Sequence, residues 1–317
     1  MAYNNPLRIK NFVIFLFLLF TILIISCNSG TSVEVTAAPE VQETVEIING
    51  EPELETEQDT ENIDNSVNPI ADEIQYTTDG VAYLVHPDKI LSGGPSKGGI
   101  GVDRGIPALS DENINFVSVT EADEWIEDNE LVLVLNYNGE KRVYPLQILV
   151  WHEIANDEVA GVPLAITYCP LCGSGIAYER TLTIESEEQV VEFGTSGKLY
   201  NSNLVMYDDA TDTYWQQIDG KAILGDLVGQ ELIDVSIDTV VWRDYKGVYS
   251  DAQVLSQDTG MSRSYGTDPY GSYYEDSLLF FSVDNEDDSI HPKTVVFGIE
   301  IEGTYKAYLE DDVIAAG

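Results

Sequence analysis

The sequence predicts an α+β fold that is predominantly β, formed by one hairpin-rich domain with a few short helices. From Tyr76 to Gly317 the chain consists of aromatic and β-branched runs separated by Gly, Asn-Gly and Asp-Gly, which is typical of short strands joined by tight turns. One segment, residues 145–154, changes to a helical period. Because no second linker interrupts this length, we expect a single globular domain over residues 76–317.

The first 27 residues have the layout of a secretory signal peptide. Arg8 and Lys10 precede an apolar run from Phe12 to Ile25. The run is shorter than the roughly 20 residues that span a bilayer, and it ends at Ile24-Ile25-Ser26-Cys27, which resembles a lipobox. We therefore expect an exported lipoprotein that is lipidated at Cys27 and anchored on the cell membrane or outer membrane, facing outside the cytoplasm. An uncleaved anchor with Cys27 as an ordinary thiol is the alternative, and it is exported too.

An acidic tether is predicted over residues 28–75. No Lys or Arg occurs from Asn28 to Asp88, and glutamates crowd the middle of this stretch. A chain with few aromatic residues and strong self-repulsion cannot offset its ordering entropy by burial, so we expect a disordered spacer.

The whole sequence contains 56 acidic and 15 basic residues, a formal net charge of −41 at pH 7. Nucleic-acid binding is disfavoured, because phosphates are bound by Lys and Arg. Adsorption to anionic lipid is disfavoured for the same reason, which leaves the N-terminal lipid as the expected membrane contact.

Two hairpins are predicted by alternating apolar residues that end at turn pairs. The first runs from Leu131 to Tyr144 around Asn138-Gly139, and the second surrounds Glu302-Gly303 between Val295 and Tyr308. The shared pattern fits an internal duplication and the general likeness of hairpins equally well.

A short helix is predicted after the first hairpin. Pro145 suits a first helical position, and Leu146, Leu149, Val150 and Ile154 fall on one face. Asn156 and Asp157 are the expected terminators. His152 then lies in the last turns, where the helix dipole favours a protonated imidazole.

The Cys169-Pro170-Leu171-Cys172 motif carries the predicted chemistry. It follows the apolar strand pattern 164–168 and precedes Gly173-Ser174-Gly175, so no long helix is expected after it. A two-residue spacer lets two sulfurs approach within bonding distance, and an exported pair can cycle through thiol–disulfide exchange. An activated thiolate needs a cationic neighbour, for which His152 is the nearest candidate.

Three functions of the cysteines remain open from the residues alone. A redox-active pair needs no cofactor but needs a protein or small-molecule redox partner of unknown identity. A structural disulfide in a non-catalytic interaction protein is the second. The third is a zinc or copper site that adds His152 or His291 to Cys169 and Cys172, with Met206 or Met261 for copper.

Several blocks resemble the domain-of-unknown-function 3179 family. They include Tyr144-Pro145-Leu146, Trp151-His152-Glu153-Ile154, Asn156-Asp157 and Thr167-Tyr168-Cys169-Pro170-Leu171-Cys172-Gly173. Further similar blocks lie between about Gly93 and Tyr308, among them Ser196-Gly197, Leu204-Val205-Met206-Tyr207-Asp208 and His291-Pro292-Lys293.

The resemblance implies no settled activity. Some similar proteins carry selenocysteine in place of the first motif cysteine, which favours the redox function. It implies that Cys169 is the nucleophile and Cys172 the resolving thiol. On this basis we expect Cys169 to be the more accessible thiol with the lower pKa, and the enzyme class, if any, to be a thiol–disulfide oxidoreductase.

Two other segments receive less weight. Residues 93–99 resemble a phosphate-binding loop only superficially, because Lys97 is neither preceded by Gly nor followed by Ser or Thr. The tyrosines at 265, 270, 273 and 274 suit either a pocket wall or ordinary packing on a sheet.

Overall fold

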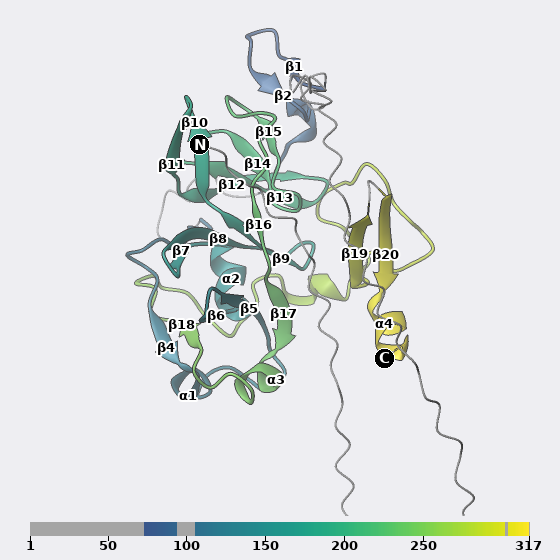
Figure 1. The fold of residues 1–317 in the computed structure, drawn as a ribbon. Coiled ribbons are helices and arrows are strands. Elements are labelled where there is room, and N and C mark those ends of the chain that lie inside the picture. Colours follow the sequence, from purple (N-terminus) through teal and green to yellow (C-terminus); the bar gives the residue numbers. More distant parts are fainter. Residues whose placement is uncertain (1–72, 94–104, 302–303, 317) are drawn as a thin grey trace, which may run out of the picture. The chain divides into compact units, whose positions relative to one another are not determined.

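The computed structural model describes residues 73–93, 105–301 and 304–316, most of them in short strands (Figure 1). The predicted fold class, α+β and predominantly β, is confirmed. The signal segment with Cys27, the acidic segment as far as residue 72 and the loop 94–99 lie outside the described residues. In the described part of the chain, no helix is long and apolar enough to cross a membrane.

Three sheets contain most of the strands. The largest has the order β1-β2-β15-β14-β13-β12-β3, and its strands are β1 (Gln75–Tyr76), β2 (Ala82–Tyr83), β15 (Ala222–Leu224), β14 (Tyr214–Gln216), β13 (Asn203–Asp208), β12 (Phe193–Tyr200) and β3 (Leu91–Ser92). The four-stranded sheet comprises β16 (Asp234–Val235), β9 (Ser174–Glu179), β8 (Val162–Cys169) and β7 (Ile154–Val159). The five-stranded sheet comprises β17 (Asp238–Val241), β5 (Leu131–Tyr137), β6 (Glu140–Pro145), β18 (Gln253–Leu255) and β4 (Phe116–Ser118).

Two further strand pairs and several short helices complete the described chain. The pairs are β10 (Thr181–Ile184) with β11 (Glu187–Val190), and β19 (Val296–Ile301) with β20 (Thr304–Leu309). The helices are α1 (Val119–Ala122), α2 (Leu146–His152), α3 (Trp242–Lys246), α4 (Glu310–Ala316), η1 (Pro87–Lys89) and η3 (Gly271–Tyr274), the last two being 3₁₀-helices.

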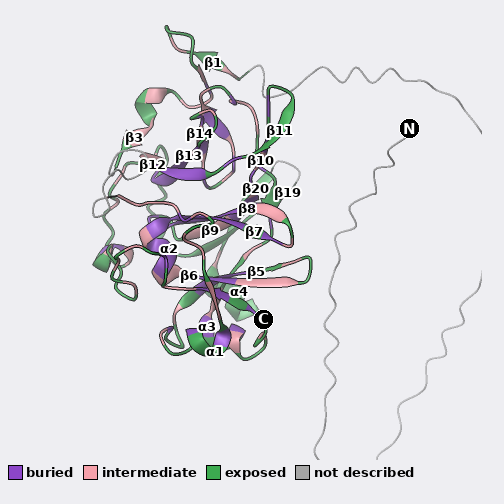
Figure 2. Ribbon diagram, turned by 90° about the vertical axis from the view of Figure 1, so that its left-hand side faces the viewer, coloured by how far each residue is buried: buried purple, intermediate pink, exposed green. Residues whose placement is uncertain are grey.

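The three sheets pack in layers, because alternate residues of a strand face opposite sides. Leu133 and Leu135 of β5 face one side, where they pack with α2 and the four-stranded sheet. Val132 and Val134 face the other side, where they pack with α1 and α3. The four-stranded sheet is covered on its far side by the seven-stranded sheet, through residues such as Met206. Figure 1 shows this order of layers, and Figure 2 shows buried residues along the strands of the layers.

Both predicted hairpins are confirmed. In the first, Asn138 and Gly139 have φ of 48° and 90°, as a turn with two left-handed residues requires, and β5 pairs with β6. In the second, β19 pairs with β20, while the turn residues 302–303 lie outside the described chain. The first hairpin belongs to the five-stranded sheet and the second forms a sheet of its own, so the internal duplication stays a prediction.

The predicted helix is confirmed but ends earlier than expected. Pro145 is the N-cap, and α2 ends at His152 because Glu153 adopts a left-handed conformation with φ of 59°. Ile154 already begins β7, where it pairs with Thr167. The expectation that Asn156 and Asp157 terminate the helix is therefore wrong, since both residues lie in β7.

Candidate functional site

The Cys-Pro-Leu-Cys motif forms the loop of a β-hairpin. Strand β8 ends at Cys169, β9 begins at Ser174, and these two residues pair across the hairpin. The Cys172 amide donates to the carbonyl oxygen of Cys169 over 3.3 Å, which closes a four-residue turn. Gly173, with φ of 60°, supplies the left-handed residue that leads into β9. The absence of a helix after the motif, predicted from the glycines, is thus confirmed for this segment.

Cys172 is the exposed cysteine of the motif. Its sulfur lies 3.1 Å from Ser174 Oγ and 3.1 Å from Nδ2 of Asn203. A hydrogen bond from the Cys169 thiol, together with those from Ser174 and Asn203, lowers the pKa of Cys172 to about 7, although the atoms packed around the sulfur partly desolvate it and oppose this shift. Near neutral pH the structure therefore stabilises a thiolate at Cys172.

Cys169 has the opposite environment. It is almost fully buried in the apolar cluster between the four-stranded and seven-stranded sheets. Besides Cys172, its Sγ has a weak acceptor in the carbonyl oxygen of Ser202 at 4.0 Å. Burial, followed by the hydrogen bond to Cys172 and the nearby Glu153, raises the pKa of the Cys169 thiol well above its ordinary value.

The expectation that Cys169 is the more accessible thiol with the lower pKa is therefore wrong. The difference arises from tertiary packing. Cys169 is the last residue of a buried strand, whereas Cys172 lies in the turn and contacts hydrogen-bond donors from β9 and β13. The two cysteines are free in the structure and are not joined by a disulfide.

His152 does not supply the expected cation. Its Nδ1 lies 2.8 Å from the carbonyl oxygen of Pro107, so this nitrogen carries the proton, and its Nε2 accepts from the Tyr265 hydroxyl over 2.6 Å. Burial lowers the pKa of His152 to about 4, so the imidazole is neutral at pH 7. The ring holds α2 against the segments that carry Pro107 and Tyr265.

Glu153, the next residue, is a buried carboxyl close to the thiols. Its Oε1 accepts a hydrogen bond of 3.3 Å from the hydroxyl of Tyr270. Burial raises the pKa of Glu153 to about 8; the hydrogen bond from Tyr270 opposes this rise, and the nearby Cys172 adds a smaller one. A carboxyl of this kind changes its protonation state near physiological pH, as acid–base groups of active sites do.

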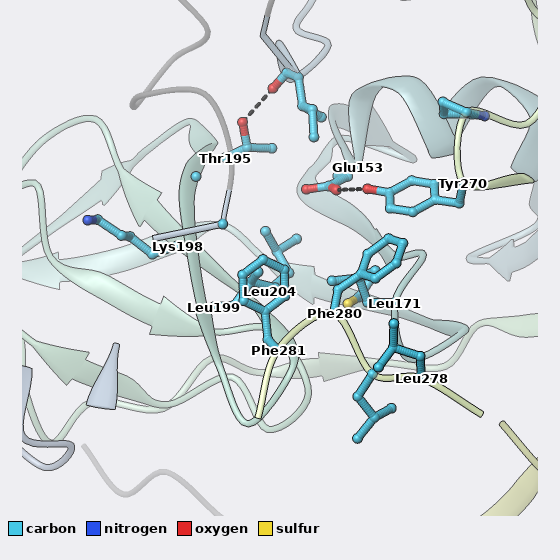
Figure 3. Close-up of a pocket in the computed structure, with 16 residues that line it drawn as sticks. Glu153, Leu171, Thr195, Lys198, Leu199, Leu204, Tyr270, Leu278, Phe280 and Phe281 are labelled. Carbon is cyan, nitrogen blue, oxygen red and sulfur yellow. Dashed lines mark hydrogen bonds between the residues drawn. The ribbon is translucent and has the colours of Figure 1, made fainter. Parts of the chain in front are cut away.

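An apolar cavity of about 520 Å³ adjoins the motif (Figure 3). Cys169, Glu153 and Tyr270 contribute to its wall, and the segment 278–281, of sequence Leu-Leu-Phe-Phe, contributes another part. Figure 3 shows Phe280 beside the hydrogen-bonded pair of Glu153 and Tyr270. The volume falls in the range of small-molecule sites, about 300–1,000 Å³.

A zinc or copper site at the two cysteines would need a third ligand, and the described part of the chain offers no His, Asp or Glu that completes such a group. There, no group of three or more His, Cys, Asp or Glu could hold a metal ion. His291 lies in an exposed turn, where its Nδ1 accepts from the Lys293 amide. Met206 is buried in the same apolar cluster as Cys169, and Met261 packs in a different cluster. Metal binding stays a prediction.

Other motif residues serve the fold. The hydroxyl of Tyr144 donates to Asp157 over 2.7 Å, which joins β6 to β7. Asn156 donates to the carbonyl oxygens of Leu109 and Phe193 and accepts from the Phe193 amide, which joins β7 to β12. These buried polar groups are satisfied by one another, and nothing in their geometry points to chemistry.

Sequence reasoning missed four residues of the site: Glu153, Ser174, Asn203 and Gln217. Gln217 Oε1 accepts from Asn203 over 2.8 Å and lies 3.0 Å from Ser174 Oγ, which can turn its one hydrogen to Gln217 or to Cys172. Gln217 therefore positions the two side chains that contact Cys172. Glu153 belongs to the Trp-His-Glu-Ile block that carried the resemblance, which was a usable signal. No local pattern marks Asn203 or Gln217. The pairing of β13 with β14 places them side by side, and their hydrogen bonds across to β8, β9 and Cys172 place them at the turn.

A hairpin loop with a polarised thiol pair beside a cavity defines this region as a candidate thiol-based site. The family model described as protein of unknown function (DUF3179) matches residues 103–317, so the chain belongs to this family. No match was found among the curated proteins or among the solved structures.

Proposed function

We propose that this protein carries out thiol–disulfide exchange, with Cys172 as the attacking thiol and Cys169 as the resolving thiol. The observation that carries the proposal is the contrast between the two sulfurs: one is exposed with a lowered pKa, and the other is buried with a raised pKa. Exchange needs one accessible thiolate to attack and a second thiol close enough to resolve the mixed disulfide.

The reaction balances with the two motif thiols alone. The Cys172 thiolate attacks one sulfur of a substrate disulfide, the substrate S–S bond breaks, and the released thiolate takes up a proton. Cys169 then loses its proton and attacks Cys172 Sγ, which releases the second substrate thiol. The protein ends with a Cys169–Cys172 disulfide, and the substrate has gained two electrons and two protons; the reverse sequence oxidises a dithiol. Because one turn closes residues 169–172, the Cα atoms are near enough for this bond.

Glu153 is the group that would accept the proton from Cys169. Both residues line the same cavity, and the charge of Cys172 contributes to the raised pKa of Glu153. Once Cys172 is bonded to the substrate it carries no charge, so the Glu153 carboxyl ionises more readily. A larger fraction of Glu153 is then carboxylate, the form that can accept a proton, at the step that needs it.

We also propose, from the signal segment and lipobox, that the chain works outside the cytoplasm on a lipid anchor at Cys27. Such compartments permit disulfides to form and persist, which is the setting that exchange requires.

Trapping the mixed disulfide tests the proposal. Cys169→Ser leaves the attacking thiol without its resolving partner, so incubation with oxidised glutathione should give a stable adduct at Cys172, visible by mass spectrometry of the intact chain. Cys172→Ser serves as the matched control: its Cys169 is buried and should form little adduct, and peptide mass spectrometry separates any adduct at Cys27, which both variants retain. A stable adduct on Cys172→Ser but not on Cys169→Ser would overturn the assignment.

A further inference from the structure

The cavity beside Cys169 has a mostly apolar wall that includes exposed aromatic and aliphatic surface. The Leu278–Phe281 segment forms one side, and although these residues line a cavity, Leu278 is 63% exposed and Phe280 is 54% exposed. Leu199 and Leu204 of the β12–β13 hairpin form another part of the wall. Apolar surface of this kind gains free energy when a ligand removes it from water.

One buried polar group in this wall lacks a complete set of hydrogen bonds. Glu153 is only 7% exposed, and Tyr270 donates to its Oε1. No described residue forms a hydrogen bond with the other carboxyl oxygen. Figure 3 shows this carboxyl group next to Phe280. A ligand that displaces water from this oxygen must replace the lost hydrogen bond, so a ligand in the cavity should present an oxygen to the carboxyl group.

The charges around the cavity select against ionic ligands. Lys198 also lines the cavity, but in Figure 3 its side chain points away from Glu153 and Tyr270. An anion would meet a chain of net charge −41, and a cation would lose its hydration in an apolar wall whose carboxyl is kept neutral by burial.

We propose that the cavity lined by Glu153, Cys169 and Phe280 binds a neutral, mostly apolar small molecule that carries a carbonyl or hydroxyl oxygen. The oxygen would pair with the Glu153 carboxyl group, and the apolar body would pack on Phe280 and its neighbours. The bound molecule would also cover the Cys169 thiol. The inference concerns binding and stands on the cavity wall, independently of the exchange reaction.

The test uses the neutral aromatic ketone prodan, whose emission shifts to shorter wavelength in apolar surroundings, titrated with the purified full-length chain. We expect saturable binding with a shifted emission, and binding of the anionic probe anilinonaphthalene sulfonate at least about tenfold weaker. Equal binding of the two probes, or no saturable shift with prodan, would overturn the proposal.

Two pairs of variants locate the site. Phe280→Ala should weaken prodan binding by about fivefold to tenfold, because an aromatic face is lost. Phe297→Ala is the matched control, since Phe297 is 47% exposed on β19 and does not line the cavity. Glu153→Leu should weaken binding by about tenfold through the lost hydrogen bond, whereas Glu153→Gln keeps a donor and most of the affinity. Equal effects of Phe280→Ala and Phe297→Ala, in variants with unchanged thermal unfolding, would contradict the assignment.

Cys172→Ser separates this inference from the exchange proposal. The substitution removes the attacking thiol but leaves the cavity wall intact, so prodan affinity should stay within about twofold of the wild type. Loss of prodan binding in this variant, with its fold intact, would count against the cavity as the binding site. Failure of glutathione trapping with retained prodan binding would refute the exchange proposal alone.

Discussion

Asn203 donates a hydrogen bond from Nδ2 to the sulfur of Cys172 over 3.1 Å, although the two residues belong to different hairpins. The same amide group donates to Gln217 Oε1 over 2.8 Å, and Asn203 Oδ1 accepts from the Ile218 amide over 3.0 Å. The side chain is therefore held in place before the thiolate forms. Hydrogen bonds to an ionised sulfur lower its pKa, and this contact links the β12–β13 hairpin to the chemistry of the turn.

Asn203→Ala should raise the pKa of Cys172 by about one unit, because a hydrogen bond to a charged group contributes about 1.5 kcal/mol or more. The pH dependence of iodoacetamide alkylation at Cys172 measures the shift. Asn115→Ala is the control, since Asn115 donates to the carbonyl oxygen of Asp258, away from the motif. An unchanged pKa in Asn203→Ala, with thermal unfolding preserved, would show that this hydrogen bond does not stabilise the thiolate.

Glu153→Gln should slow the resolution of a mixed disulfide by about a hundredfold, since positioned acid–base groups contribute about 10²–10⁴ to rates. The amide keeps the size of the side chain but cannot accept the Cys169 proton. Reactions with oxidised glutathione are stopped at successive times and analysed by mass spectrometry, which gives the lifetime of the Cys172 adduct. The exposed Glu158→Gln in β7 is the matched control. Equal adduct lifetimes in the two variants would remove Glu153 from the mechanism.

His152 should make the fold sensitive to acid. Its pKa is about 4 in the folded protein and near 6.5 in the unfolded chain, so between these values only the unfolded chain binds the proton. Stability contributed by neutral His152 is present above about pH 6.5 and is lost as the pH falls toward 4. Urea unfolding of the wild type and of His152→Gln across this range should show a smaller decline in the variant.

The same variant should leave the pKa of Cys172 unchanged, because both ring nitrogens of His152 are bonded to Pro107 and Tyr265. A raised Cys172 pKa in His152→Gln would restore the imidazole to the site. Parallel acid sensitivity of the two proteins would show instead that His152 is not the group that titrates.

Cys27→Ser should abolish lipid attachment, because the lipobox places the lipidated thiol at Cys27. Labelling of growing cells with a fatty-acid analogue, followed by membrane fractionation, should show a labelled membrane-bound wild type. The variant should appear as an unlabelled precursor or as released protein. Labelling and processing identical to the wild type would refute the lipoprotein prediction.

Much of the fold could be predicted from the sequence, because strands and turns have local sequence patterns. Alternation and the Asn138-Gly139 pair predicted the β5–β6 hairpin, and the glycines after Cys172 predicted that no helix follows the motif. The end of α2 was misjudged because Glu153 adopts a left-handed conformation, which glutamate rarely does and which no local pattern signals.

The roles of the site residues could be predicted only in part, for a different reason. The two cysteines could be found from their spacing, but the difference between them arises from contacts across sheets. Cys169 is buried by the seven-stranded sheet, and Cys172 is polarised by Asn203. His152 was chosen for its proximity along the chain, whereas its ring faces Pro107 and Tyr265. Roles that depend on packing between distant strands cannot be assigned from spacing alone.

The most direct test of the exchange mechanism is the pH dependence of alkylation at each motif cysteine, measured by peptide mass spectrometry on the reduced, folded protein. We predict that Cys172 reacts first, with a pKa of about 7, and that Cys169 is protected until the protein is unfolded. Faster alkylation of Cys169 with the lower pKa would contradict the assignment of Cys172 as the attacking thiol.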